Sequence, residues 1–182
     1  MTTVTTLPRS RPLTRADLED TPDDGHRYEL IDGVLIVSPG PELPHQDMVG
    51  NLHLVLRAAC PAGLKVVLAP FDVVLADDTV IEPDLLVAPR SQFVRKCLPG
   101  EPLLAVEVLS PSTRRFDLLL KRDRLQQAGC PSYWLVDPVA VAVTVLELRD
   151  GTYEQVAHVT GGQAYDAVLP FPVRLVPVEL QD

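Results

Sequence analysis

The 182-residue chain has few cysteines and few aromatic residues, and it has no long apolar run. Its three cysteines, Cys60, Cys97 and Cys130, are an odd number at wide spacing, which argues against a disulfide framework or a thiolate metal site and predicts free thiols. No apolar stretch reaches the roughly 18 residues that span a bilayer. The first residues also lack the apolar segment of a secretory signal, so we expect a cytoplasmic protein with no membrane partner.

Histidine is scarce as well, and charge is unevenly distributed. The four histidines include no HExxH pair, which argues against a histidine-rich zinc site. The net charge of −9 argues against a general nucleic-acid coat protein. Between Arg90 and Arg124, however, eight basic residues stand against four acidic ones. A polyanion would bind near this segment, although a solvated helix face explains the same pattern.

Apolar patterning predicts α/β (α+β) structure, a mixed β-sheet flanked by helices, in one domain over residues 14–182 that follows a flexible tail over residues 1–13. Asp32-Gly33 and Asp150-Gly151 predict tight turns in an N-terminal and a C-terminal hairpin. Further strands are predicted at 64–69, 71–76, 80–88, 102–109 and 132–137. Helices are predicted after Thr14, at 45–60 and at 116–128, the last one ending at Gly129.

The stretch LLAVEVLSPST, residues 103–113, places the carboxylate of Glu107 in a strand that is otherwise apolar. Burying an ionised carboxylate costs several kcal/mol unless a cation or hydrogen-bond donors compensate. Asp84, in EPDLLVA, begins another apolar run, and the two carboxylates converge if these strands pair. Oxygen ligands of this kind favour a hard ion such as Mg²⁺ or Mn²⁺. The alternative is that each is a strand-end carboxylate that faces water.

The predicted helix at 116–128 carries Lys121 toward its apolar side. Its ammonium has three open alternatives: an i,i+4 pair with Asp117, a contact with the Asp84 and Glu107 pair, or extension to solvent. Leu119 and Leu120 fall outside the apolar arc, which predicts neighbours on more than one side of this helix. Glu29, in the first hairpin, and His45, at a helix start, are further candidates, although each is also typical of a structural residue.

These residues resemble the bacterial Uma-two family of restriction endonucleases, within the PD-(D/E)XK nuclease-like superfamily. The resemblance is carried, from about Tyr28 to Pro138, by YELIDG, HQ, PDLLV, LLAVEVLSPST, a later Asp and Lys, and AGCPSYWLVDP. It implies a restriction-endonuclease-like fold, with a central mixed sheet and helices on both sides. A divalent metal would be bound by Asp84, Glu107 and the carbonyl of Val108.

The resemblance also implies a catalytic lysine, and here the sequence departs from the superfamily pattern. The position two residues after the glutamate is Leu109, so the lysine corresponds to Lys121 on the helix. Glu29 corresponds to an acidic position near the metal, and His45 to the helix-start residue. Leu125 stands where the family usually has tyrosine, which removes a hydrogen-bond partner from the site.

The leading hypothesis is a Mg²⁺- or Mn²⁺-dependent endonuclease that hydrolyses DNA, with Asp84, Glu107 and Lys121 as catalytic residues. Lys121 would orient the attacking water or stabilise developing charge. Arg114, Arg115 and Arg122 are candidate phosphate contacts, and cutting both strands of a duplex predicts a homodimer. A nuclease-like scaffold used for binding or regulation is the alternative, and a hydrolase of another phosphorylated substrate is the third.

Overall fold

The computed structural model describes residues 11–111 and 114–181. A six-stranded mixed sheet forms its centre, in the order β11-β10-β9-β8-β6-β3. The pair β8–β9 is parallel and the other neighbours are antiparallel. The strands of this sheet are β3 (Leu64–Leu68), β6 (Leu85–Pro89), β8 (Leu104–Val108), β9 (Ser132–Asp137), β10 (Ala142–Arg149) and β11 (Thr152–Thr160).

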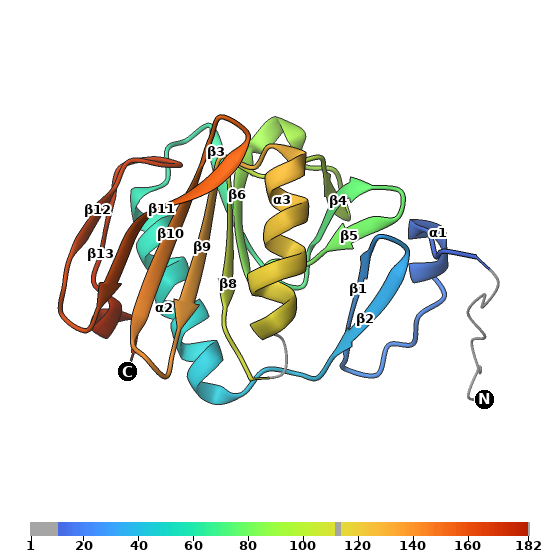
Figure 1. Cartoon of the computed structure of the whole chain (residues 1–182), viewed down its shortest axis with the longest axis horizontal. Coiled ribbons are helices and arrows are strands. Elements are labelled where there is room, and N and C mark those ends of the chain that lie inside the picture. The colour runs from blue at the N-terminus through green and yellow to red at the C-terminus, as the bar shows by residue number, and fades with distance from the viewer. Residues whose placement is uncertain (1–10, 112–113, 182) are drawn as a thin grey trace.

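One helix covers each face of the central sheet, as Figure 1 shows. Helix α2 (Leu43–Ala59) packs Met48, Leu52 and Leu56 against the sheet face that carries Val106 and Trp134. Helix α3 (Arg122–Ala128) packs on the other face through Leu125. Fully burying each leucine stabilises the fold by about 1.5–3 kcal/mol. The predicted mixed sheet flanked by helices is confirmed.

A second sheet of five strands lies beside α3, in the order β2-β1-β5-β4-β7. Its strands are β1 (Arg27–Ile31), β2 (Val34–Ser38), β4 (Asp72–Ala76), β5 (Thr79–Ile81) and β7 (Cys97–Pro99). The predicted strand over residues 80–88 is wrong as one element, because β5 and β6 belong to different sheets. Pro83 has no N–H for a ladder, and Glu82-Pro83-Asp84 carries the chain between the sheets.

Both predicted Asp-Gly turns are confirmed. Asp32 and Gly33 have φ of 53° and 74°, and Asp150 and Gly151 have φ of 49° and 80°, as a primed turn requires. A Cβ on Gly33 would lie 2.5 Å from that of Pro12, so only glycine fits there. The C-terminal hairpin extends the central sheet at its edge.

The remaining elements lie around the two sheets. They are α1 (Arg15–Leu18), η1 (Arg90–Gln92), η2 (Phe116–Lys121), β12 (Tyr165–Ala167), β13 (Val173–Leu175) and η3 (Pro177–Leu180). The β12–β13 hairpin forms a small third sheet that the sequence analysis did not predict. No helix within the described ranges is both long and apolar enough to cross a bilayer.

Residues 1–10 of the predicted N-terminal tail fall outside the described residues. Leu13, within the same predicted tail, is buried with Leu30 and Val80, and its N–H donates to the carbonyl of Gly33 at 2.9 Å. The chain just before Thr14 therefore packs on the first hairpin. All three cysteines are free thiols, as predicted.

Candidate active site

Asp84 and Glu107 lie at the same end of the central sheet. Strands β6 and β8 are antiparallel neighbours with Leu85 opposite Val106. Asp84, which precedes β6, therefore lies opposite Glu107, the next-to-last residue of β8. The pairing on which the predicted convergence depends is confirmed. Both carboxylates are almost completely buried, so each needs compensating charge or donors.

Asp84 is compensated on both of its oxygens. Arg27 donates to Oδ1 at 2.8 Å, while the N–H of Val108 at 2.8 Å and Nε2 of His45 at 3.1 Å contact Oδ2. Burial alone would raise the pKa of Asp84, but the His45 hydrogen bond and the Arg27 charge lower it to about 2. Asp84 is therefore an ionised carboxylate at neutral pH.

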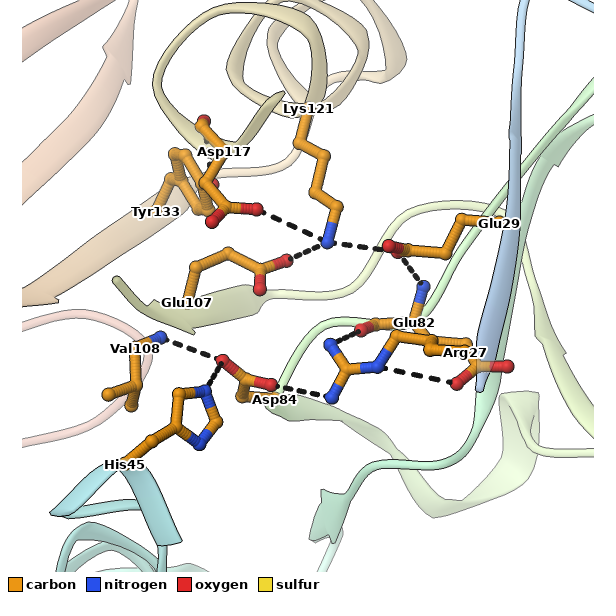
Figure 2. Close-up of polar contacts among 10 residues, drawn as sticks. All are labelled: Arg27, Glu29, His45, Glu82, Asp84, Glu107, Val108, Asp117, Lys121 and Tyr133. Atoms are coloured by element: carbon orange, nitrogen blue, oxygen red, sulfur yellow. Dashed lines mark hydrogen bonds and ion pairs between the residues drawn. The ribbon is translucent and has the colours of Figure 1, made fainter. Parts of the chain in front are cut away.

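Glu107 receives its compensation from Lys121, as Figure 2 shows. The Lys121 Nζ lies 3.0 Å from Glu107, 2.9 Å from Glu29 and 3.4 Å from Asp117. Extension to solvent is thus the wrong alternative for Lys121, because its side chain is only 2% exposed. Two of the alternatives hold together, the Asp117 pair and a contact with Glu107, and Glu29 is a third partner.

Lys121, Glu29, Glu107 and Asp117 form an ion cluster, in which burial acts differently on the lysine and on Glu107. Burial would lower the pKa of Lys121, but the charges of Glu107 and Glu29 raise it well above its ordinary value, so the ammonium stays charged. Burial raises the pKa of Glu107 well above its ordinary value, and the attraction of Lys121 only partly opposes that rise. The pKa values of the neighbouring Asp84 and Glu107 are therefore shifted in opposite directions, a pattern that is typical of catalytic carboxyl pairs.

The segment that positions Lys121 is a π-helix, η2, which continues into α3. The Tyr133 hydroxyl donates to the Asp117 main-chain carbonyl at 3.0 Å and so anchors this turn to β9. Wide turns of this kind occur often at functional sites. Leu119 and Leu120 are exposed, so these two leucines do not contact the further neighbours that they were expected to meet. The helix nevertheless packs in one apolar cluster with residues of both sheets.

Arg27 and Glu82 are site residues that the sequence analysis missed. Arg27 bridges Asp84 to the Glu82 main-chain carbonyl, at 3.2 Å, and its Nε lies 3.8 Å from the Glu82 carboxylate. Glu29 accepts the N–H of Glu82 at 2.7 Å. Strand alternation in β1 was an available signal, because it places Arg27 on the same face as Glu29.

A cavity of about 580 Å³ opens beside the two carboxylates. Arg27, His45, Asp84 and Glu107 form its polar end, and the rest of its surface is mostly apolar. Lys121 lies behind Glu107 and outside this lining. The Nδ1 atom of His45 is buried and makes no hydrogen bond within the described chain. A second cavity of about 450 Å³ lies next to it and shares Arg27, His45 and Asp84.

The site residues suit a magnesium-like ion. The carboxyl groups of Glu29, Glu82, Asp84, Glu107 and Asp117 surround the cations Arg27 and Lys121, so five acidic groups stand against two basic ones. Over the described ranges no three His, Cys, Asp or Glu side chains are grouped to hold a metal. Mg²⁺ does not need such a group, because it keeps several waters and binds through one or two carboxylates together with substrate phosphates.

The three candidate phosphate contacts do not converge on the cavity. Arg114 pairs with Asp137 at 2.8 Å, Arg115 is exposed, and Arg122 donates to the Tyr153 carbonyl at 3.4 Å. The Val108 carbonyl stays a predicted metal ligand, since the contact that Val108 makes to Asp84 is through its N–H.

The sequence from residue 15 to 179 matches the family named Uma2, described as "Putative restriction endonuclease". The chain belongs to the Uma2 family. The comparison with curated proteins found no match. The fold is similar to the crystal structure of a "putative nuclease belonging to DUF820" from Anabaena variabilis, with a TM-score of 0.75 and 20% identity over 93% of this chain and 97% of that one.

Membership of Uma2 and this similarity confirm the restriction-endonuclease-like fold. The Uma2 match covers every element that contributes a side chain to the site, from β1 to η2. The tertiary structure also accounts for the departure from the superfamily pattern at Leu109. Leu109 packs in the core between the central sheet and α3, while Lys121 reaches Glu107 from the helix instead.

Proposed function

We propose that this chain is a divalent-metal-dependent endonuclease that hydrolyses phosphodiester bonds of DNA. The observation that carries the proposal is the placement of Asp84 and Glu107 in the lining of one cavity, within a cluster in which carboxyl groups outnumber cations. Membership of the Uma2 family supports the same reaction class.

A bound Mg²⁺ or Mn²⁺ would neutralise charge on the scissile phosphate and lower the pKa of a bound water. Asp84 and Glu107 would hold the ion, and the Val108 carbonyl would be a further ligand. Arg27 fixes the Asp84 carboxylate by a 2.8 Å contact, and the Val108 N–H and His45 fix its other oxygen. These contacts fix the orientation of the Asp84 carboxylate, and an ion that binds it would compete with the Arg27 guanidinium for Oδ1.

Lys121 acts through Glu107 in this proposal. Its ammonium is enclosed by three carboxylates and does not line the cavity, so direct contact with a water or phosphate would require it to move. Its positive charge partly opposes the rise that burial causes in the pKa of Glu107, and so favours the anionic form that an ion would bind. The predicted role in orienting water stays a prediction, as do the roles of His45, Glu29 and Asp117.

The second candidate is a nuclease-like scaffold that binds without hydrolysis. The specific observation in its favour is that Arg27 already occupies one Asp84 oxygen, while His45 and the Val108 N–H occupy the other. In that case the arginine would stand where a metal stands in an active nuclease.

Calorimetric titration with Mn²⁺ separates the two candidates. The wild-type chain should bind Mn²⁺, Glu107→Gln should lose binding at least tenfold, and Glu101→Gln, an exposed control, should not change it. Absence of wild-type binding would favour the scaffold. Cleavage of plasmid DNA in Mn²⁺ by the same three proteins then tests hydrolysis. The same assay with Lys121→Ala tests the lysine, because an unchanged cleavage rate would remove Lys121 from the mechanism.

The predicted homodimer belongs to this proposal, because cutting both strands of a duplex needs two sites. Light scattering after size-exclusion chromatography tests it. A monomeric protein that nicks one strand at a time would contradict the predicted homodimer but not the proposed metal site.

A further inference from the structure

The cavity beside Asp84 and Glu107 has walls that differ sharply in chemistry from its polar end. Five prolines line it within the described chain, together with Leu109 and Val139; the prolines are Pro39, Pro41, Pro44, Pro111 and Pro138. Proline fixes its own backbone φ, so these walls are rigid before any ligand enters. A preformed apolar wall loses little conformational entropy on binding.

The size of the cavity suits a small molecule or one part of a larger one. At about 580 Å³ it falls within the range of about 300–1,000 Å³ that is typical of small-molecule sites. Its walls come from three parts of the chain, the β2–α2 link, the end of β8 and the β9–β10 turn. In Figure 1 the β2–α2 link passes beneath the end of β8.

The charges around the cavity do not suit a duplex. Of the lining residues that the structure describes, Arg27 carries the one permanent positive charge, against Glu42, Asp84 and Glu107. Proteins that hold duplex DNA present a basic face that contacts many phosphates. Arg114, the nearest predicted phosphate contact in sequence, is paired with Asp137. The positive charge of the lining is thus limited to Arg27, which can meet one phosphate, while most of the cavity surface is apolar and suits an apolar group.

We infer that the cavity takes the base of one unpaired nucleotide, and that the substrate is therefore single-stranded DNA or an unpaired segment of a duplex. This rests on the proposed function and names its substrate class. The phosphate of that nucleotide lies at the polar end, beside Arg27 and the carboxylate pair. The base packs between the proline walls, as extruded bases do between apolar side chains. Ser38 and Gln181, also in the lining, supply polar groups for its edge.

Fluorescence anisotropy with three labelled probes tests this inference, in buffer with Ca²⁺ in place of Mn²⁺. The probes are a 12-residue oligothymidylate, the duplex of the same length, and a fully abasic chain of the same charge. We expect the oligothymidylate to bind about tenfold tighter than either of the others, because it alone offers an unpaired base to the apolar walls. Equal affinity for the abasic chain, or tighter binding of the duplex, would overturn the inference.

A pair of matched variants tests whether binding occurs in this cavity. Val139 lines it and is 88% exposed, whereas Val168 is 70% exposed and lies outside the lining. Val139→Glu should weaken oligothymidylate binding about tenfold by placing a charge in the apolar wall that holds the base, and Val168→Glu should change it less than twofold. Neither substitution disturbs the core. Equal effects of the two variants would show that the strand binds elsewhere.

Cleavage separates this inference from the proposed function. A protein that prefers the single strand but cleaves nothing in Mn²⁺ keeps this inference and loses the proposed function. A protein that cuts duplex as fast as single strand keeps the proposed function and loses this inference.

Discussion

The Lys121 ammonium donates to the Glu107 carboxylate at 3.0 Å, with both groups almost completely removed from water. This contact explains how a strand of the central sheet carries an acidic residue in its core. It also joins the helical segment η2–α3 to β8, so the geometry of the carboxylate pair depends on a residue of another element.

Replacing Lys121 by methionine should destabilise the fold by about 3–5 kcal/mol, because Glu29, Glu107 and Asp117 would be left buried without their cation. Urea denaturation measures the change. Lys96→Met, at an exposed position, is the control and should change stability by less than about 0.5 kcal/mol.

Adding Glu29→Gln to the Lys121 variant should restore part of the loss, since it removes one of the three unpaired charges. Additive destabilisation by the two substitutions would contradict the ion cluster described here, because residues in contact couple and distant ones do not.

Mn²⁺ binding should strengthen as pH rises. Burial raises the pKa of Glu107 well above its ordinary value, so below that raised pKa the ion must displace a proton from the carboxyl. Affinity should then fall up to tenfold for each pH unit of acidification and level off above the raised pKa. Calorimetry in buffers of different ionisation enthalpy counts the released proton. No proton release at neutral pH would show that Glu107 is already ionised.

Removing Arg27 should increase Mn²⁺ affinity about tenfold, a free-energy change of about 1.4 kcal/mol, because its guanidinium occupies Asp84 Oδ1 at 2.8 Å. The same Arg27→Ala variant should bind oligothymidylate more weakly, since it loses the cation at the polar end of the cavity. Arg149→Ala, at the exposed end of β10, is the matched control. Weaker Mn²⁺ binding by Arg27→Ala would show that the arginine supports the metal site instead.

Glu82 should make the fold less stable as pH rises from about 4.5 to about 7. Burial raises the pKa of Glu82 to about 7 from an ordinary 4.5, although Arg27 opposes the rise. In that window the folded chain holds a proton that the unfolded chain has released, so the free energy of unfolding falls with increasing pH. Glu82→Gln should reduce this slope, measured by urea denaturation at pH 5 and pH 7.5, and the part that stays comes from other groups with a raised pKa such as Glu107. The exposed control Glu154→Gln should leave it in place.

Local sequence alone determined several of the turns and side-chain orientations around the site. Asp-Gly pairs predict the two hairpin turns because primed turns need positive φ at both central residues. Alternation assigns Glu107 to one face of its strand together with Ala105 and Leu109, and those two residues pack against α3 as this requires. Helical spacing predicts that Lys121 faces inward.

Only the tertiary structure decided which partners these residues meet. Arg27 and Asp84 are 57 positions apart and Glu29 and Lys121 are 92 apart in the chain, so no local pattern relates them. The break at Glu82-Pro83-Asp84 reads as part of one strand, because strand patterns do not say to which sheet a strand belongs. The π-helix also escaped prediction, since its wide turn is anchored by a hydrogen bond from Tyr133 on β9. Side-chain identity set the available charges, whereas burial and long-range packing set which of them face one another and how their pKa values move.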